Sequence, residues 1–276
     1  MSKLSILRYP GSKSKIYDVV KKIIKDNGLS SKTYCEPFAG GFGCGLQLLV
    51  NRDVNKVIIN DLDRHIYSFW VSIFNFSDEL IKKIKETEIT IVEWKKQKKI
   101  YEHTENHSLC EVGFSTLFLN RTNFSGILTA GPLGGFSQKG KYKLNCRFNK
   151  EKVIESIEEV SKYKDKVEVY NLDFLSLIFL LKNRENEMFY NFDPPYVEKG
   201  HICYEQSFNT KQHYTLFFIA KLIRTDWIMT YDNSKFIIDL YRDYNQSQFS
   251  IFYSAGNKLL ETELMISNFL SKENLA

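Results

Sequence analysis

The stretch "EMFYNFDPPY", Glu187–Tyr196, is an apolar and aromatic run that ends in an acid and two prolines. Its composition predicts a buried strand, and the prolines end it because Pro has a fixed φ and no N–H. After it come "HYTLFFIAKLIR", which predicts a helix, "DWIMTYDN", which predicts a strand, and "KFIIDLYRDY", which predicts a second helix. Strands that alternate with helices indicate an α/β protein with an open, mostly parallel sheet and helices on both faces.

The N-terminal part of the chain, up to about Asp63, shows the same alternation. "IYDVVKKIIKDNG" has apolar residues at helical spacing and ends at Gly28, and "KVIIND", Lys56–Asp61, predicts a short strand. Beyond residue 150, "KVEVYNLDF" predicts a further strand, and "QFSIFYSA" with "ETELMISNFL" predicts a closing pair of strands. Because ligands of open α/β sheets bind at the carboxyl ends of the strands, we expect the functional residues there.

The middle of the chain, about Arg64 to Lys150, departs from this alternation. It begins with a helical pattern, "SDELIKKIKETE", for which Ser77 is the expected N-cap. The following "FLNRTNFSGILTAGPLGGFSQKGKYKLNCRFN" mixes Gly, Pro and polar residues with short apolar stretches, which predicts irregular loop and a hairpin. We therefore expect one discontinuous domain, residues 1–63 and 151–276, and a mainly helical insertion, residues 64–150.

The bulk composition excludes several classes of protein. The 276 residues are 43% hydrophobic and 26% charged, with a formal net charge of +5 that permits a polyanionic partner. Five scattered cysteines without C-x-x-C spacing predict neither a zinc site nor a disulfide framework. The longest apolar run, Leu175–Leu181, is too short to span a bilayer. Reduced thiols and the absence of a signal-peptide pattern lead us to expect a cytoplasmic protein.

A glycine-rich segment, "YCEPFAGGFGCG" at Tyr34–Gly45, predicts a strand that runs into a tight turn and a helix. Glycines there let the backbone approach a ligand closely, although a plain turn is the simpler interpretation of this segment alone. The spacing is not that of a P-loop. Asp61 ends the next strand, about 20 residues later, where an acid binds ribose hydroxyls or caps a helix. Together the two features favour a site for an adenosine-type ligand.

The Asp-Pro-Pro-Tyr turn has a chemistry of its own. Each residue before a proline is held extended, so the turn can aim the Asp193 carboxylate and the Pro194 carbonyl at one point. Two acceptors suit an exocyclic amine, which offers two N–H donors, and Tyr196 supplies a flat face for a base. A merely rigid turn requires neither the acid nor the aromatic residue.

The motifs together resemble the Dam-type (D12 class) DNA adenine-N6 methyltransferases. "DPPY" after an apolar strand, with "EPFAGG" and "ND" upstream, carries the resemblance, and "RYPGSK", "FLNRTNFSG", "GKYKLNCRFNK" and "YSAGNKLLETELMI" extend it over nearly the whole chain. The resemblance implies a Rossmann-like methyltransferase sheet with a target-recognition insertion that bears a β-hairpin or loop. It also implies S-adenosylmethionine as cofactor, no metal, and methyl transfer to an adenine flipped out of double-stranded DNA at a specific site.

The resemblance assigns three groups of residues. The catalytic group is Asp193, Pro194, Pro195 and Tyr196. The cofactor-binding group is Tyr9, Pro10, Gly11, Lys13, Glu36, Pro37, Phe38, Gly40, Gly41, Asp61, Asp173, Phe174 and Asp193, in which Asp61 takes the ribose hydroxyls while Asp173 and Phe174 bracket the adenine of the cofactor. The DNA-binding group is Arg121, Asn123, Phe124, Ser125, Lys139, Lys141, Lys143 and Arg147. This last group lies in residues 117–150, which contain basic and aromatic residues and no acid, as suits phosphate contact.

Four positions depart from the pattern of that family, one of them Ser125, which replaces an Asn. Tyr9 stands where Trp is usual, and Phe42 stands in the glycine turn where a small residue is usual, so that we expect Gly43 to compensate. Thr129 stands where GATC-methylating members have an Arg. Because Arg to guanine is the commonest specific base contact, GATC is not the expected target.

Other functions remain open on the sequence. The same Asp-Pro-Pro-Tyr turn serves methylation of cytosine N4 or of RNA adenine, and a non-catalytic DNA-binding protein can have the same fold. A single chain is sufficient for the reaction, so we expect a monomer, with a dimer as the alternative. A cognate restriction endonuclease that acts separately is one partner the family implies, and a chromosomal or phage role is the alternative.

Overall fold

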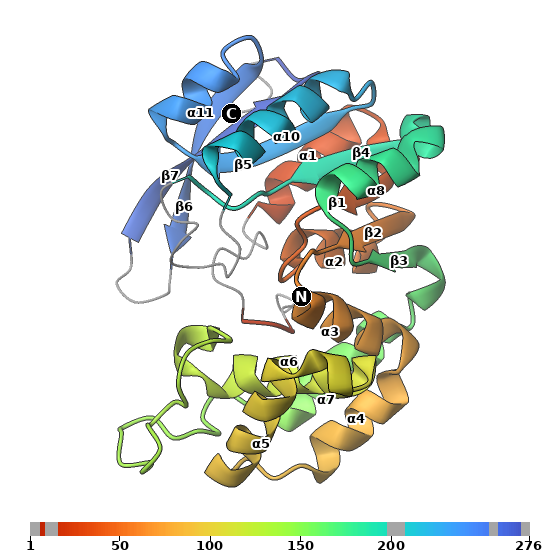
Figure 1. The fold of residues 1–276 in the computed structure, drawn as a ribbon. Helices are drawn as coiled ribbons and strands as arrows, with labels where there is room; N and C mark the ends of the chain where they lie inside the picture. The colour runs from red at the N-terminus through yellow and green to blue at the C-terminus, as the bar shows by residue number, and fades with distance from the viewer. Residues whose placement is uncertain (1–5, 9–15, 198–207, 254–258, 272–276) are drawn as a thin grey trace.

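The computed structural model describes residues 6–8, 16–197, 208–253 and 259–271 (Figure 1). These residues form one seven-stranded sheet in the order β3-β2-β1-β4-β5-β7-β6. The strands are β1 Thr33–Glu36, β2 Lys56–Asn60, β3 Val167–Tyr170, β4 Met188–Phe192, β5 Trp227–Asp232, β6 Asn245–Tyr253 and β7 Leu259–Ser267. The pairs from β3 to β5 are parallel, and β7 pairs antiparallel with both β5 and β6. The predicted parallel sheet and its closing strand pair are confirmed.

Helices follow the strands as the alternating pattern predicts. The α-helices are α1 Tyr17–Asp26, α2 Gly43–Val50, α3 Arg64–Asn75, α4 Ser77–Glu86, α5 Ile91–Glu102, α6 Leu109–Thr122, α7 Lys150–Ser161, α8 Phe174–Leu181, α10 Thr210–Leu222 and α11 Lys235–Leu240. Short 3-10 helices are η2 Leu29–Ser31, η3 Thr104–Asn106, η4 Phe124–Gly126, η5 Lys164–Lys166 and η6 Lys182–Glu187. Among the described residues, every helix is too short or too polar to cross a lipid bilayer.

Both faces of the sheet are covered by helices. Along β2, Val57 and Ile59 belong to the hydrophobic cluster that contains α1, α2 and α3, whereas Ile58 belongs to the cluster with α8 and α10. Along β4, Phe189 and Tyr190 divide in the same way. Since successive strand residues point to opposite faces, this division shows a sheet buried on both sides, as parallel sheets require. The architecture is a Rossmann-like α/β fold with a seven-stranded, mainly parallel sheet.

The helices α3 to α7 lie between β2 and β3 in the chain. Figure 1 shows α4 to α7 gathered at one end of the molecule, below the sheet. Their apolar residues, among them Phe118 on α6 and Ile157 on α7, belong to the same cluster as Val57 of the sheet. One continuous core therefore joins these helices to the sheet.

Two local predictions in this region are wrong. Ser77 is not an N-cap, because α3 and α4 are separated by Phe76 alone, which caps both helix ends, and Ser77 is already the first helical residue. The predicted hairpin is absent, since residues 123–149 are all described and contain no strand, only an isolated bridge between Asn123 and Pro132. The loop alternative is correct. Gln138, at φ 51°, closes this loop by donating to the carbonyls of Leu133 and Gly135 in place of a strand ladder.

Candidate active site

The predicted site residues of the sheet lie at or just after the carboxyl ends of β1, β2, β3 and β4. The chain adds β2 and β3 on one side of β1, and then β4 and β5 on the other side. The order therefore reverses between β1 and β4, and such a switch point is where open α/β sheets bind their ligands.

The glycine turn after β1 is held by the buried carboxylate of Glu36. Its Oε1 accepts from the Tyr34 hydroxyl at 2.7 Å and from the Gly45 N–H at 3.1 Å. An acid at the N-terminus of α2 also interacts favourably with the helix dipole. Glu36, predicted to bind the cofactor, is thus positioned by the structure as the anchor of the turn.

Phe42 sits inside the turn, at φ 44°, with its ring buried. A Cβ on Gly45 would lie 2.2 Å from this ring, so Gly45 makes room for Phe42, and the role of Gly43 stays a prediction. The ring also packs edge-on against Trp70 of α3, whose Nε1–H donates to the Gly40 carbonyl at 2.9 Å. Trp70 therefore fixes the glycine turn from the helical region.

Asp61, just after β2, faces this turn. Its Oδ2 accepts from the Gly40 N–H at 2.8 Å and its Oδ1 from the Asp63 N–H at 2.9 Å. Burial, together with the neighbouring Asp63 carboxylate, raises the pKa of Asp61 to about 7. A carboxylate has about four lone-pair sites, so two backbone donors leave acceptor capacity for ligand hydroxyls.

Asn60 joins three strand ends and was not predicted as a site residue. Its Nδ2 donates to the carbonyls of Pro37 and Leu172, both at 2.9 Å, and its Oδ1 accepts from the Leu172 N–H at 3.0 Å. The side chain is completely buried. The sequence does carry signals, since Asn60 is an amide at the end of an otherwise apolar strand, "KVIIN", and the first residue of the "ND" motif.

Aromatic rings line the β1 and β3 side of these strand ends. Phe38 lies 5.5 Å between centroids from both Phe174 and Phe208, and Phe174 lies 5.8 Å from Phe208. Asp173 caps α8 by accepting from the Leu175 and Ser176 N–H groups. The Ser176 hydroxyl also donates to it, and these hydrogen bonds lower the pKa of Asp173. Its carboxylate is thus engaged in ending the helix, while Phe174 joins the aromatic group.

The Asp-Pro-Pro-Tyr turn follows β4 directly. The half-buried Asp193 accepts a hydrogen bond at Oδ1 from the hydroxyl of Thr230 on the neighbouring β5, at 2.8 Å. Pro194 and Tyr196 are buried, and Pro195 is half-buried. Thr230, like Asn60, was not predicted.

The predicted DNA-binding residues divide between buried and exposed positions. Asn123 is completely buried; its Oδ1 accepts from Trp94 Nε1–H at 2.6 Å, and its Nδ2 donates to the Ile127 and Leu128 carbonyls. The guanidinium of Arg121 is partly buried and donates to the Ile6 carbonyl. Burial and the charge of Arg8 lower the pKa of Arg121 to about 10. Both side chains therefore hold the protein together.

The neighbouring loop residues face outward. Phe124 is 64% exposed and follows the buried Asn123, while Ser125 has a left-handed backbone at φ 55°. Lys139, Lys141, Lys143 and Arg147 are exposed. Tyr142 is exposed among them, with Lys141 Nζ and the Arg147 guanidinium within 6 Å of its ring centroid. The loop therefore presents an exposed surface of basic and aromatic side chains.

Residues 9–255 match the family described as D12 class N6 adenine-specific DNA methyltransferase. The chain belongs to this family. It is also 26% identical over 205 residues to the type II methyltransferase M.MjaIII of Methanocaldococcus jannaschii, an alignment that covers 69% of this chain and 68% of that protein. The chain is accordingly an S-adenosylmethionine-dependent DNA adenine-N6 methyltransferase, as the motifs imply.

The strand ends of this methyltransferase fit the adenosine part of S-adenosylmethionine. Asp61 offers acceptors for ribose hydroxyls beside the positive-φ Gly40, and Phe38 and Phe174 offer apolar ring faces close by. Gly41 lies in the same turn. The predicted residues Tyr9, Pro10, Gly11 and Lys13 lie outside the described residues.

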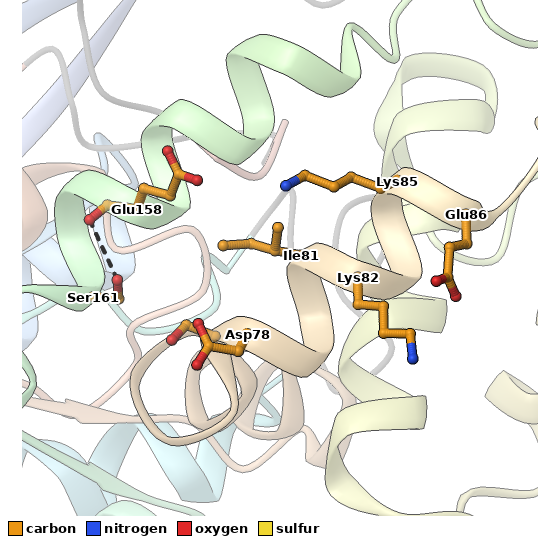
Figure 2. Close-up of a pocket in the computed structure, with 8 residues that line it drawn as sticks. Asp78, Ile81, Lys82, Lys85, Glu86, Glu158 and Ser161 are labelled. Atoms are coloured by element: carbon orange, nitrogen blue, oxygen red, sulfur yellow. Dashed lines mark hydrogen bonds between the residues drawn. The ribbon is translucent and has the colours of Figure 1, made fainter.

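A separate groove lies between α4 and α7 of the methyltransferase (Figure 2). It has a volume of about 470 Å³ and is lined by Ser77, Asp78, Ile81, Lys82, Lys85, Glu86, Glu158 and Ser161. The lining contains none of the predicted site residues, and both acidic and basic side chains line it. The strand ends, and not this groove, form the candidate active site.

Proposed function

We propose that this methyltransferase acts on an adenine flipped out of duplex DNA at a specific sequence, with Asp193–Tyr196 as its catalytic turn. The observation that supports this best is the hydrogen bond from Thr230 to Asp193, because it fixes a carboxylate at the switch point, where the cofactor turn also lies. An adenine inside a duplex cannot reach such a site, so the base must leave the stack.

The turn offers two hydrogen-bond acceptors for the exocyclic amine of the target base. The Asp193 carboxylate and the Pro194 carbonyl would each accept one N–H of the adenine amine, which favours a pyramidal nitrogen whose lone pair is available for attack. Tyr196 would stack on the base. When bound, S-adenosylmethionine supplies a methyl group activated by a positively charged sulfur. Holding two reactants in the right geometry contributes up to about 7–11 kcal/mol in favourable cases.

The cofactor would be held mainly by the β1 and β2 ends. In this proposal Asp61 accepts from the ribose hydroxyls, Gly40 and Gly41 allow close approach, and Phe38 with Phe174 contacts the adenine ring of the cofactor. Glu36 and Asp173 act indirectly, by fixing the turn and the start of α8. Tyr9 and Lys13 complete the site on the strength of the family pattern.

Target recognition would belong to residues 64–150, inserted between the two parts of the catalytic domain, 1–63 and 151–276. Phe124 and Tyr142 are exposed aromatic residues for contact with bases, and the exposed Lys139, Lys141, Lys143 and Arg147 suit phosphate contact. In this proposal Asn123 and Arg121 support the loop from inside the protein.

The name of the type II relative supports a role in restriction and modification. In this proposal the chain acts as a monomer and protects DNA from a separate endonuclease with the same target sequence.

Nucleoside analysis after methyl transfer tests the proposed function. The protein is incubated with isotopically labelled S-adenosylmethionine and, in parallel, unmethylated bacterial genomic DNA or total RNA, and the digested nucleosides are identified by mass spectrometry. We expect label in N6-methyl-2′-deoxyadenosine only, and none with Asp193→Ala. Label in N4-methyl-2′-deoxycytidine, or in RNA adenosine alone, would identify a different amine as the substrate.

A further inference from the structure

Three consecutive residues at the end of β5 contact the catalytic turn. The Thr230 hydroxyl donates to Asp193 Oδ1 at 2.8 Å, and the Val197 N–H, just after the turn, donates to Asp232 Oδ1 at 3.3 Å. Between them, the ring of Tyr231 lies 6.2 Å from that of Tyr196. The turn is therefore held at its start, at its aromatic residue and at its exit by one short piece of strand.

This piece of strand is itself fixed. Thr230, Tyr231 and Asp232 are all at least nine-tenths buried, and β5 is paired on both sides, with β4 and with β7. The hydroxyl of Tyr231 lies 2.9 Å from Nδ1 of the buried His213 on α10. Burial lowers the pKa of His213, which favours a neutral ring as the partner of the hydroxyl. The contacts of Thr230, Tyr231 and Asp232 therefore hold the catalytic turn against a rigid part of the sheet.

The Thr230 hydroxyl has two acceptors within reach but only one hydrogen. Asp193 Oδ1 at 2.8 Å is closer than the Phe192 carbonyl at 3.5 Å, so the hydrogen bond goes to the carboxylate. A donor on one oxygen restricts rotation of the carboxylate and leaves its remaining lone pairs available as acceptors. Thr230 therefore acts on the orientation of Asp193.

We propose that the end of β5 positions the catalytic turn, and that Thr230 is the positioning residue that orients the Asp193 carboxylate toward the target amine. The proposal rests on the proposed role of Asp193 as an acceptor for that amine. According to this proposal, full activity also requires a hydroxyl group outside the Asp193–Tyr196 motif, that of Thr230 at the end of the neighbouring strand.

The same two strands carry a matched control. Thr225 lies just before β5, is 6% exposed, and its hydroxyl donates to the Met188 carbonyl at the start of β4, at 2.6 Å. Thr230 occupies the opposite end of the same strand pair and is fully buried. Thr→Val removes the same hydroxyl in either place while keeping the branched shape, so both variants carry a comparable cost to folding.

The test compares Thr230→Val, Thr230→Ser, Thr225→Val and Asp193→Ala in the full-length protein. Methyl transfer from tritiated S-adenosylmethionine to unmethylated bacterial genomic DNA gives kcat and the KM for the cofactor, and thermal unfolding gives Tm. We expect Thr230→Val to lower kcat about 10- to 100-fold, the size of a hydrogen bond to a charged group, with a KM within about threefold. Thr230→Ser restores kcat to within about threefold of wild type, and Thr225→Val lowers Tm similarly with an unchanged kcat.

The failures are distinguishable. If Thr230→Val turns over like Thr225→Val while Asp193→Ala is inactive, the positioning role is wrong and the catalytic assignment stands. If Thr230→Ser is as slow as Thr230→Val, the hydroxyl is not the group that matters, which also overturns the proposal. If Asp193→Ala remains active, the proposed function of the turn is itself wrong.

Discussion

The strand ends and the loop after α6 differ in how their polar residues are used. At the strand ends, Asp61 and Asp193 each contact a neighbouring turn or strand and remain beside the switch point. In the loop, Asn123 is buried and bonded to Trp94, 29 positions away, whereas the adjacent Phe124 is exposed. Both regions carry residues of the family motifs, but only the hydrogen-bond partners separate those proposed to bind a ligand from those that hold the protein together.

The comparison shows that a motif can mix two roles within two or three residues. Glu36 and Asn60 belong to the same strand ends as Asp61, yet their side chains are buried and bonded to protein groups. Since a buried polar group without a partner is costly, replacing such a residue is expected to lower the stability of the fold. Variants at paired positions can therefore test which role each residue has.

The largest effect is expected at Asp193. In the proposed mechanism Asp193→Ala removes the carboxylate that accepts from the target amine, so we expect methyl transfer to fall by at least about 10³-fold. The half-buried position makes a folding defect small by comparison, and thermal unfolding checks this. Methyl transfer above one tenth of wild type would remove Asp193 from the mechanism.

A structural variant at the start of α2, next to the glycine turn, should have the next largest effect. Gly45→Ala places a Cβ 2.2 Å from the Phe42 ring, so we expect a loss of roughly 1–3 kcal/mol in the free energy of unfolding, with weaker binding of S-adenosylmethionine. Gly131→Ala is the control, because a Cβ there has no heavy atom within 4 Å. Urea unfolding measures both. Equal stability of the two variants would show that Phe42 can move aside.

The neighbours Asn123 and Phe124 test the two roles within the loop. Asn123→Ala leaves the buried Trp94 N–H without its acceptor and should cost about 1–3 kcal/mol of stability. Phe124→Ala should leave stability within about 0.5 kcal/mol and weaken binding to duplex DNA. Thermal unfolding and fluorescence anisotropy with labelled DNA separate the two outcomes. If Asn123→Ala is as stable as wild type but binds DNA more weakly, Asn123 contacts DNA and does not serve mainly to hold the loop.

The strand ends also predict a pH dependence of cofactor binding. Because the pKa of Asp61 is raised to about 7, its carboxylate is mostly protonated near pH 6 and mostly ionised near pH 8. Only the ionised form accepts from both ribose hydroxyls, so affinity for S-adenosylmethionine should rise about tenfold over that range. Calorimetric titration of wild type and Asp61→Asn tests this, since the variant should bind weakly at every pH. An equal slope in the variant would assign the dependence to another group.

The raised pKa of Asp61 has the opposite effect on folding stability: in the cofactor-free protein, stability falls as pH rises. The folded chain retains a proton on Asp61 that the unfolded chain releases near pH 3.8, so this group makes folding less favourable as pH rises from about 4 to 7. In Asp61→Asn this contribution is absent, and urea unfolding at several pH values measures the difference.

The sequence predicts a site residue at a strand end when that residue directly follows an apolar run. "KVIIND" and "EMFYNFDPPY" place Asp61 and Asp193 correctly because each follows its strand at once. Asn60 and Thr230 were missed because their partners, Leu172 and Asp193, lie 112 and 37 positions away and meet them only in the folded sheet. Signals existed in both cases, since each is a polar side chain in a buried strand.

The loop was less predictable for a physical reason. Its glycines and polar residues are compatible with a hairpin, but Ser125 and Gln138 have positive φ values and the Gln138 side chain closes the loop. Such side-chain-to-backbone bonds leave no periodic pattern in the sequence. Which polar side chains are buried also depends on contacts between distant parts of the chain. Asn120, for example, hydrogen-bonds to the N–H and the carbonyl of Arg8, 112 positions away.

Long-read modification sequencing of DNA from cells that express the protein tests the central claim most directly. We expect N6-methyladenine at one short sequence motif in cells with the wild-type chain, and its absence in cells with Asp193→Ala. The motif found is not expected to be GATC, because Thr129 stands where an Arg would read guanine. Modified cytosine in place of adenine, or N6-methyladenine that persists with Asp193→Ala, would contradict an adenine methyltransferase whose active site is the Asp193–Tyr196 turn.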